Sequence, residues 1–126
     1  MKKTPSVRPT WDVYFMDIAR VVATRSNCVR RHVAAVIVKD RRIISTGYNG
    51  TPRGVRNCFE GGCPRCAGEA PSGGALDECI CSHAEENAIT QAAYHGIAVA
   101  GSILYTTMSP CLICAKMSIN AGIAEV

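Results

Sequence analysis

Apolar positions in the first third of the chain follow helical spacing and then strand spacing. Residues 11–25 are predicted to form a helix with one buried face, because Thr10 is a residue type that caps helices and apolar side chains recur every three or four positions after it. The runs 33–38 and 43–48 are apolar and rich in β-branched residues, and the polar stretch 39–42 separates them. This pattern predicts a two-stranded hairpin.

The last third of the chain alternates between helix-like and strand-like segments. Helices are predicted at 83–95 and 111–121, each of which is followed by a glycine that can end it. Strands are predicted at 102–106 and from 123 onward, where the printed sequence stops as the strand begins. The alternation predicts an α/β domain whose helices pack on a mixed sheet of at least four strands.

Between these parts, residues 49–82 show no periodicity and hold seven glycines, three prolines and five cysteines. A loop of this length is unusual in a compact domain, and a bound metal is the natural way to order it. The 126 residues allow one domain of ordinary size. We therefore expect a flexible tail at 1–9 and a single domain at 10–126.

Charge is distributed unevenly along the chain. Residues 1–65 hold 13 of the 14 basic residues, whereas residues 66–126 hold six of the ten acidic ones. A basic half of this kind indicates either an anionic partner or simply a solvated basic face. Charged residues interrupt every apolar run, so we expect neither a membrane span nor a secretory signal, and we expect a cytoplasmic protein, with the nucleus as the alternative location.

Eight cysteines in a chain without a secretory signal favour metal binding over disulfides. Six of them fall in close pairs, and neighbours this close favour chelation over mutual bridging. The pairs are Cys63 with Cys66, Cys79 with Cys81, and Cys111 with Cys114.

Two predicted helices begin with residues that suit a catalytic zinc site. His83 opens one helix, and Cys111 and Cys114 open the other. One imidazole and two thiolates leave the fourth tetrahedral position free for water, and Glu85 is near enough to move a proton of that water without being a ligand. His-x-Glu followed by Pro-Cys-x-x-Cys is the known signature of zinc-dependent deaminases. Glu86, beside Glu85, is interpreted as solvated helix surface.

At these residues, and over positions 11–126 in general, the sequence resembles the deoxycytidylate (dCMP) deaminases of the cytidine deaminase superfamily. A cysteine-rich stretch between Asn57 and His83 is similar to the fungal-type branch of that family. The segments that carry the resemblance are Arg25-Ser26-Asn27-Cys28, Gly47-Tyr48-Asn49-Gly50-Thr51-Pro52-Arg53, His83-Ala84-Glu85-Glu86-Asn87-Ala88 and Ser109-Pro110-Cys111.

The resemblance implies a three-layer α/β/α cytidine deaminase-like domain that hydrolyses dCMP to dUMP and ammonia and so supplies thymidylate synthesis within pyrimidine metabolism. Glu85 would then serve as base and acid in turn, and hydroxide would attack C4 of the cytosine. The family also implies allosteric control by dCTP and dTTP and a homo-oligomer. Related chains continue past residue 126, so the domain is expected to be C-terminally truncated.

Substrate contacts follow from the resemblance and from residue chemistry. By resemblance, Asn49 would hydrogen-bond the sugar and the backbone of Ala84 would contact the base, although an asparagine before glycine also suits a tight turn. Arg25, Ser26 and Arg53 are candidates for the 5′-phosphate, because arginine binds phosphate oxygens through paired charge-assisted hydrogen bonds.

The remaining six cysteines are candidates for one or two structural zinc ions. The resemblance implies a site that uses Cys28, Cys58 and one or both of Cys79 and Cys81. A local knuckle that joins Cys63 and Cys66 to Cys79 and Cys81, a six-cysteine cluster with two zinc ions, and free buried thiols remain open alternatives.

Two other functions share the same motifs. One is a deaminase of a flipped base in single-stranded nucleic acid. Two observations disfavour it: the aromatic content is low (6%), and no aromatic residue neighbours Arg41 and Arg42 in sequence. The other is a noncatalytic zinc-binding module, which Glu85 disfavours, because a structural site needs no acid beside an open ligand position.

Overall fold

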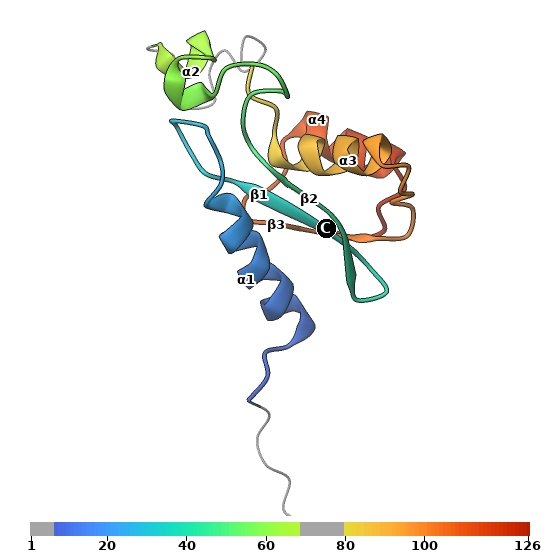
Figure 1. The fold of residues 1–126 in the computed structure, drawn as a ribbon. Helices are drawn as coiled ribbons and strands as arrows, with labels where there is room; N and C mark the ends of the chain where they lie inside the picture. Colours follow the sequence, from blue (N-terminus) through green and yellow to red (C-terminus); the bar gives the residue numbers. More distant parts are fainter. Residues whose placement is uncertain (1–6, 69–79) are drawn as a thin grey trace, which may run out of the picture.

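The computed structural model describes residues 7–68 and 80–126, and residues 1–6 of the predicted tail lie outside this range. A single sheet, in the order β2-β1-β3, lies between two helical layers (Figure 1). Helix α1 packs on one face, and α3, with α4 beside it, covers the other. The elements are α1 (Trp11–Ala23), β1 (Ala34–Lys39), β2 (Arg42–Tyr48), η1 (Cys58–Glu60), α2 (Pro64–Ala67), α3 (Ala84–Tyr94), β3 (Ile103–Thr106) and α4 (Leu112–Asn120). The α/β architecture expected from the sequence is confirmed.

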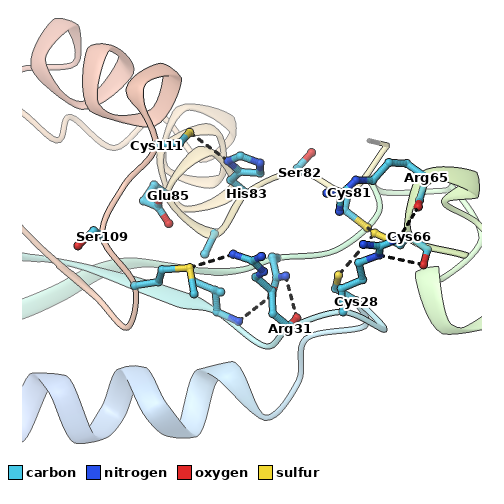
Figure 2. Close-up of a pocket in the computed structure, with 15 residues that line it drawn as sticks. Cys28, Arg31, Arg65, Cys66, Cys81, Ser82, His83, Glu85, Ser109 and Cys111 are labelled. Atoms are coloured by element: carbon cyan, nitrogen blue, oxygen red, sulfur yellow. Dashed lines mark hydrogen bonds between the residues drawn. The ribbon is translucent and has the colours of Figure 1, made fainter. Parts of the chain in front are cut away.

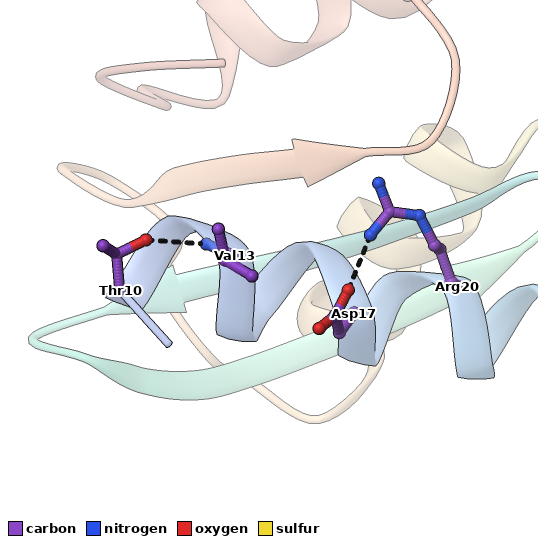
Figure 3. Close-up of polar contacts among 4 residues, drawn as sticks. All are labelled: Thr10, Val13, Asp17 and Arg20. Carbon is purple, nitrogen blue, oxygen red and sulfur yellow. Dashed lines mark hydrogen bonds and ion pairs between the residues drawn. The ribbon is translucent and has the colours of Figure 1, made fainter. Parts of the chain in front are cut away.

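Helix α1 begins where the sequence predicts, because the hydroxyl of Thr10 accepts a hydrogen bond from the backbone N–H of Val13 at 3.3 Å (Figure 3). On its exposed side, Arg20 pairs with Asp17 at 2.7 Å. A surface pair at this spacing contributes only a few tenths of a kcal/mol, about 0.3–0.5. The helix is held instead by its apolar face, which packs Phe15 and Ala19 against β1.

The predicted hairpin is present, with a shorter turn than the polar stretch indicated. Only Asp40 and Arg41 lie between the strands, and both have positive φ angles (53° and 59°), as a two-residue turn of this type requires. The guanidinium of Arg41 lies 5.3 Å from the centre of the Trp11 ring. No aromatic residue neighbours this turn in sequence, but α1, distant in sequence, supplies one in space.

The sheet has three strands among the described residues rather than the four or more expected. Strand β3 pairs antiparallel with β1, so that Val36 faces Tyr105. Beyond β3, Ile103 and Glu125 form an isolated parallel bridge, with Leu104 N–H donating to the carbonyl of Glu125 at 2.8 Å. A single bridge over these last residues is too short to make a strand.

Helix α3 lies unusually close to β2. A Cβ atom on Gly47 would lie 2.4 Å from the carbonyl oxygen of Ala84 and 2.4 Å from the backbone nitrogen of Ala88. The hydroxyl of Ser45 also donates to the carbonyl of Ala88 at 2.6 Å. This contact fixes the first turn of α3, and with it Glu85, relative to the sheet.

Among the described residues of the aperiodic segment 49–82, residues 49–68 form two short helices that the sequence did not predict, η1 and α2. Its backbone is tied to the rest of the domain through Arg30, whose guanidinium donates to the carbonyls of Cys66, Arg65 and Gly68 at 3.2, 3.3 and 2.9 Å. None of the helices in the described part of the chain is both long and apolar enough to cross a membrane.

Candidate metal centres and active site

The starts of two helices meet at the end of the sheet where β1 begins and β2 ends, and they bring together His83, Cys111 and Cys114. His83 is the N-cap of α3 and Cys111 is the N-cap of α4, so the predicted position of the motifs at helix starts is confirmed. Nδ1 of His83 lies 3.3 Å from Sγ of Cys111 and 3.4 Å from Sγ of Cys114.

These distances suit a shared zinc ion. With zinc bonds of about 2.3 Å to sulfur and about 2.0–2.1 Å to nitrogen, tetrahedral geometry places the two ligand atoms about 3.6 Å apart. The three atoms lie within 4.8 Å of one another, and the set consists of one imidazole and two thiols. Three ligands leave the fourth position open, as a catalytic zinc site requires.

Glu85 lies beside this group without belonging to it. Its side chain is only 4% exposed and lines the same cavity as His83 and Cys111 (Figure 2). Burial raises the pKa of the Cys114 thiol, and the negative charge of Glu85 raises it further. A bound cation would reverse this effect, because metal coordination deprotonates a thiol. The carboxylate and the thiols thus form a site that favours positive charge.

The first turn of α3 also uses Glu86, which the sequence analysis interpreted as solvated surface. Its carboxylate accepts a hydrogen bond from the backbone N–H of His83 at 3.1 Å. Glu86 therefore caps the helix at the residue that carries the imidazole. Glu85 and Glu86 have different roles because adjacent helical positions point about 100° apart.

A second group gathers four buried thiols from distant parts of the chain: Cys28, Cys58, Cys66 and Cys81. Their sulfur atoms all lie within 4.8 Å of one another. Cys66 Sγ is 3.8 Å from Cys28 Sγ and 4.0 Å from Cys81 Sγ, which excludes a disulfide and matches the edge of about 3.8 Å expected for a ZnS₄ tetrahedron.

The environment of these thiols also fits a cation. Burial is the largest single influence on Cys28 and disfavours its ionisation, but hydrogen bonds from the backbone at Arg31 and Arg30 and from the neighbouring thiols Cys66 and Cys58 together lower the pKa of Cys28. Burial and the neighbouring sulfurs raise the pKa of Cys81 instead. Four soft donors, all of them buried, are typical of a structural zinc site.

The other two candidate cysteines are not in this group. Cys63 is fully buried next to it, and its sulfur accepts a hydrogen bond from the backbone N–H of Ile80 at 3.3 Å. Cys79 lies outside the described residues. The four-sulfur group combines Cys28, Cys58 and Cys81, which the family resemblance implied, with Cys66, which only the local alternatives included.

Both cysteine groups border one cavity of about 180 Å³. The cavity also reaches Asn49 and Ala84, two of the substrate contacts implied by the resemblance. The side-chain amide of Asn49 is already engaged by the protein: its oxygen accepts from Val33 N–H at 2.8 Å and from Ser26 Oγ at 2.6 Å. Asn49 thus fixes the end of β2 as well as bordering the cavity.

The three phosphate candidates do not gather there. Ser26 is buried on the Asn49 amide, and Arg25 is exposed outside the cavity. Arg53 lies over the ring of Tyr94, 4.3 Å from its centre, and donates to Gln91 at 3.1 Å. The arginines that line the cavity are others: Arg30, Arg31 and Arg65. No motif in the sequence distinguishes these three; their only sequence signal is proximity to Cys28 or Cys66.

Comparison with known proteins gives a consistent result. Residues 9–126 match the family model described as the cytidine and deoxycytidylate deaminase zinc-binding region. The chain is 50% identical to the deoxycytidylate deaminase of Schizosaccharomyces pombe over 119 residues, which is 94% of this chain and 37% of that protein. It is 42% identical to the deoxycytidylate deaminase of Mycobacterium phage D29, over 94% of each chain.

Among solved structures, the chain is similar to the dCMP deaminase of the cyanophage S-TIM5 in complex with dCMP and dUMP. The TM-score is 0.74 and the sequence identity 34%, over 94% of this chain and 79% of the phage chain. The chain spans less than two fifths of the length of the fungal relative, whereas it spans nearly all of the D29 enzyme.

Proposed function

Because the chain belongs to the cytidine and deoxycytidylate deaminase zinc-binding family, we propose that it catalyses the hydrolytic deamination of dCMP to dUMP and ammonia. The observation that carries the proposal is an open group of three ligands, His83, Cys111 and Cys114, with the buried carboxylate of Glu85 in the same cavity. The choice of dCMP is supported by the relatives named deoxycytidylate deaminase and by the phage structure solved with dCMP and dUMP.

In this proposal, His83, Cys111 and Cys114 hold a catalytic zinc ion. Bound there, zinc would supply Lewis-acid chemistry that makes a water more acidic. Glu85 takes the two protons of the attacking water in turn and delivers one to N3 of the cytosine and the other to the departing amine. The water oxygen bonds to C4, the C4–N4 bond breaks, and ammonia leaves. Ala84, at the first position of α3, offers its backbone to the base.

The second zinc ion of the proposal is structural and is held by Cys28, Cys58, Cys66 and Cys81. Its support is the chemistry of the donor set, four buried sulfurs at tetrahedral spacing. The ion would tie together segments that no regular secondary structure connects, which explains how the described residues 49–68 and 80–82 can be held in place.

The proposal also includes several further expectations. The family resemblance implies a homo-oligomer and control by dCTP and dTTP. The sequence pattern predicts a fourth strand from residue 123 onward and a cytoplasmic location, with the nucleus as the alternative. Size-exclusion chromatography with light scattering tests the oligomer, and activity measured with each nucleotide added tests the control.

The alternative of a polynucleotide substrate gains no support near the active site. One group of aromatic and basic residues, Trp11, Tyr14, Arg41 and Arg42, lines a separate hollow. This hollow lies at the turn of the hairpin, whereas the cavity lies at the opposite end of the strands, next to Val33 and Asn49. A second pair, Arg53 over Tyr94, does not line the cavity either.

The experiment is to incubate the zinc-loaded protein with dCMP, with cytidine and with a cytosine-containing single-stranded oligonucleotide, and to measure ammonia release and the loss of cytosine absorbance. We expect selective turnover of dCMP, and we expect Glu85→Gln to reduce kcat at least 100-fold while zinc content stays unchanged. Turnover of the oligonucleotide alone would replace the proposal with the alternative, and equal activity of Glu85→Gln would refute the assigned role of Glu85.

A further inference from the structure

The cavity has two chemically different ends. Figure 2 shows Glu85, Cys111 and Ser109 on one side and Arg65 and Cys66 on the other, with Arg31 between them. All six line the same cavity. A nucleotide whose base lies at the Glu85 end would therefore direct its other end toward the cysteine-rich segment 57–66.

Among the described residues, the side of the cavity away from Glu85 carries excess positive charge. Three arginines line the cavity, and among the described residues that line it Glu85 is the only carboxylate. Arg65 is 9% exposed, which is rare for an arginine. In Figure 2 the side chains of Arg31 and Arg65 extend into the cavity from different segments. Arg31 belongs to the loop between α1 and β1, and Arg65 belongs to α2. Two guanidinium groups that face one space are typical of a site for a phosphate group.

Arg30 has a different role from the other two. Its guanidinium donates to three backbone carbonyls, those of Arg65 and Cys66 within α2 and that of Gly68 directly after it. It therefore fixes the backbone that carries Arg65. The sulfur of Cys66, the next residue, belongs to the four-cysteine group. The position of Arg65 thus depends on two independent attachments, one to Arg30 and one to the metal-binding sulfurs.

We propose that Arg65 and Arg31 bind the 5′-phosphate of the substrate, and that the cysteine-rich segment thereby makes the enzyme selective for a nucleotide over a nucleoside. This inference rests on the proposed function, because it assigns the phosphate end of the same cavity. It replaces Arg25, Ser26 and Arg53 as the phosphate candidates.

A purely structural role is the competing explanation for Arg65. Four thiolates around one zinc ion carry a net charge of −2, and a nearby guanidinium could serve only to balance it. The two roles differ in what is lost on substitution. A phosphate ligand affects only ligands that carry phosphate, whereas a counter-charge affects zinc content and stability.

The test compares Arg65→Gln with Arg56→Gln. Arg56 is an exposed arginine directly before segment 57–66 and does not line the cavity. Binding of dUMP and deoxyuridine, which differ only by the phosphate, is measured by calorimetry at two salt concentrations. Turnover of dCMP and deoxycytidine is measured in parallel, and bound zinc is determined by mass spectrometry. Arg31→Gln provides a second, exposed site if Arg65→Gln does not fold.

We expect Arg65→Gln and Arg31→Gln each to weaken dUMP binding and to lower kcat/KM for dCMP at least tenfold, since a hydrogen bond to a charged group is lost. Deoxycytidine turnover and zinc content should stay within twofold of wild type, and Arg56→Gln should match wild type throughout. Equal losses for nucleotide and nucleoside, loss of zinc, or no change in dUMP binding would overturn the inference. Failure of the wild-type protein to act on dCMP would instead refute the proposed function itself.

Discussion

The close approach of β2 and α3 predicts a large effect for Gly47→Ala. The added methyl group would lie 2.4 Å from both Ala84 O and Ala88 N, whereas ordinary contacts begin at 3.4 Å. The strand and the helix would have to separate by about 1 Å, because both atoms belong to the backbone and no rotamer change can relieve the overlap.

The magnitude follows from three contributions. Overpacking against backbone falls at the upper end of its usual range, about 3 kcal/mol. Separation also stretches the 2.6 Å hydrogen bond from Ser45 to Ala88, which is worth about 1 kcal/mol. Loss of glycine freedom in the unfolded chain offsets about 0.4–1 kcal/mol. We expect a net loss of about 3 kcal/mol, which lowers the Tm of a chain of this length by about 10 °C.

The assay is urea unfolding of the zinc-loaded protein followed by far-UV circular dichroism, with Thr46→Ala as the matched control. Thr46 is the neighbouring residue of β2 and is exposed, so its truncation should cost less than about 1 kcal/mol. If Gly47→Ala were as stable as Thr46→Ala to within about 0.5 kcal/mol, α3 would not lie against β2 as described.

Three further predictions concern the cysteines, the carboxylate of Glu85 and the hydroxyl of Tyr105. Cys66→Ala should remove one zinc per chain and lower the Tm, whereas Cys63→Ala should keep full zinc content in the same elemental assay; equal zinc loss would contradict the four-sulfur site. For Glu85→Gln we expect unchanged zinc content and dUMP affinity within a few-fold of wild type by calorimetry, so that only the chemical step is lost. Burial and the hydrogen bond to Asp12 raise the pKa of Tyr105 from 10 to about 12. The stability that this hydroxyl contributes is therefore fully present below pH 10 and is lost as the pH rises toward about 12. The difference in unfolding free energy between wild type and Tyr105→Phe should shrink over that interval. A constant difference would refute the raised pKa of Tyr105.

Local features of this protein could be read from the sequence because they depend on nearby residues. Thr10 caps α1 through a residue three positions away, and His83 and Cys111 begin helices that their own neighbours specify. The proposed set of zinc ligands is predictable for the same reason, because each half of it is a short motif at a helix start. The zinc-binding chemistry of the donors joins the two halves, and the resemblance to dCMP deaminases then implied the substrate.

Only the tertiary structure decided which distant groups meet. Cys28 reaches Cys66 across 38 positions, and no spacing rule could choose Cys66 over Cys63 as its partner. The same holds for the arginines: Arg53 belongs to the family-like motif but lies over Tyr94, whereas Arg65 lines the cavity. Pattern and composition specify which side chains are buried or charged, but the direction in which a loop side chain points depends on the backbone that packing, hydrogen bonds and metal ligands hold in place.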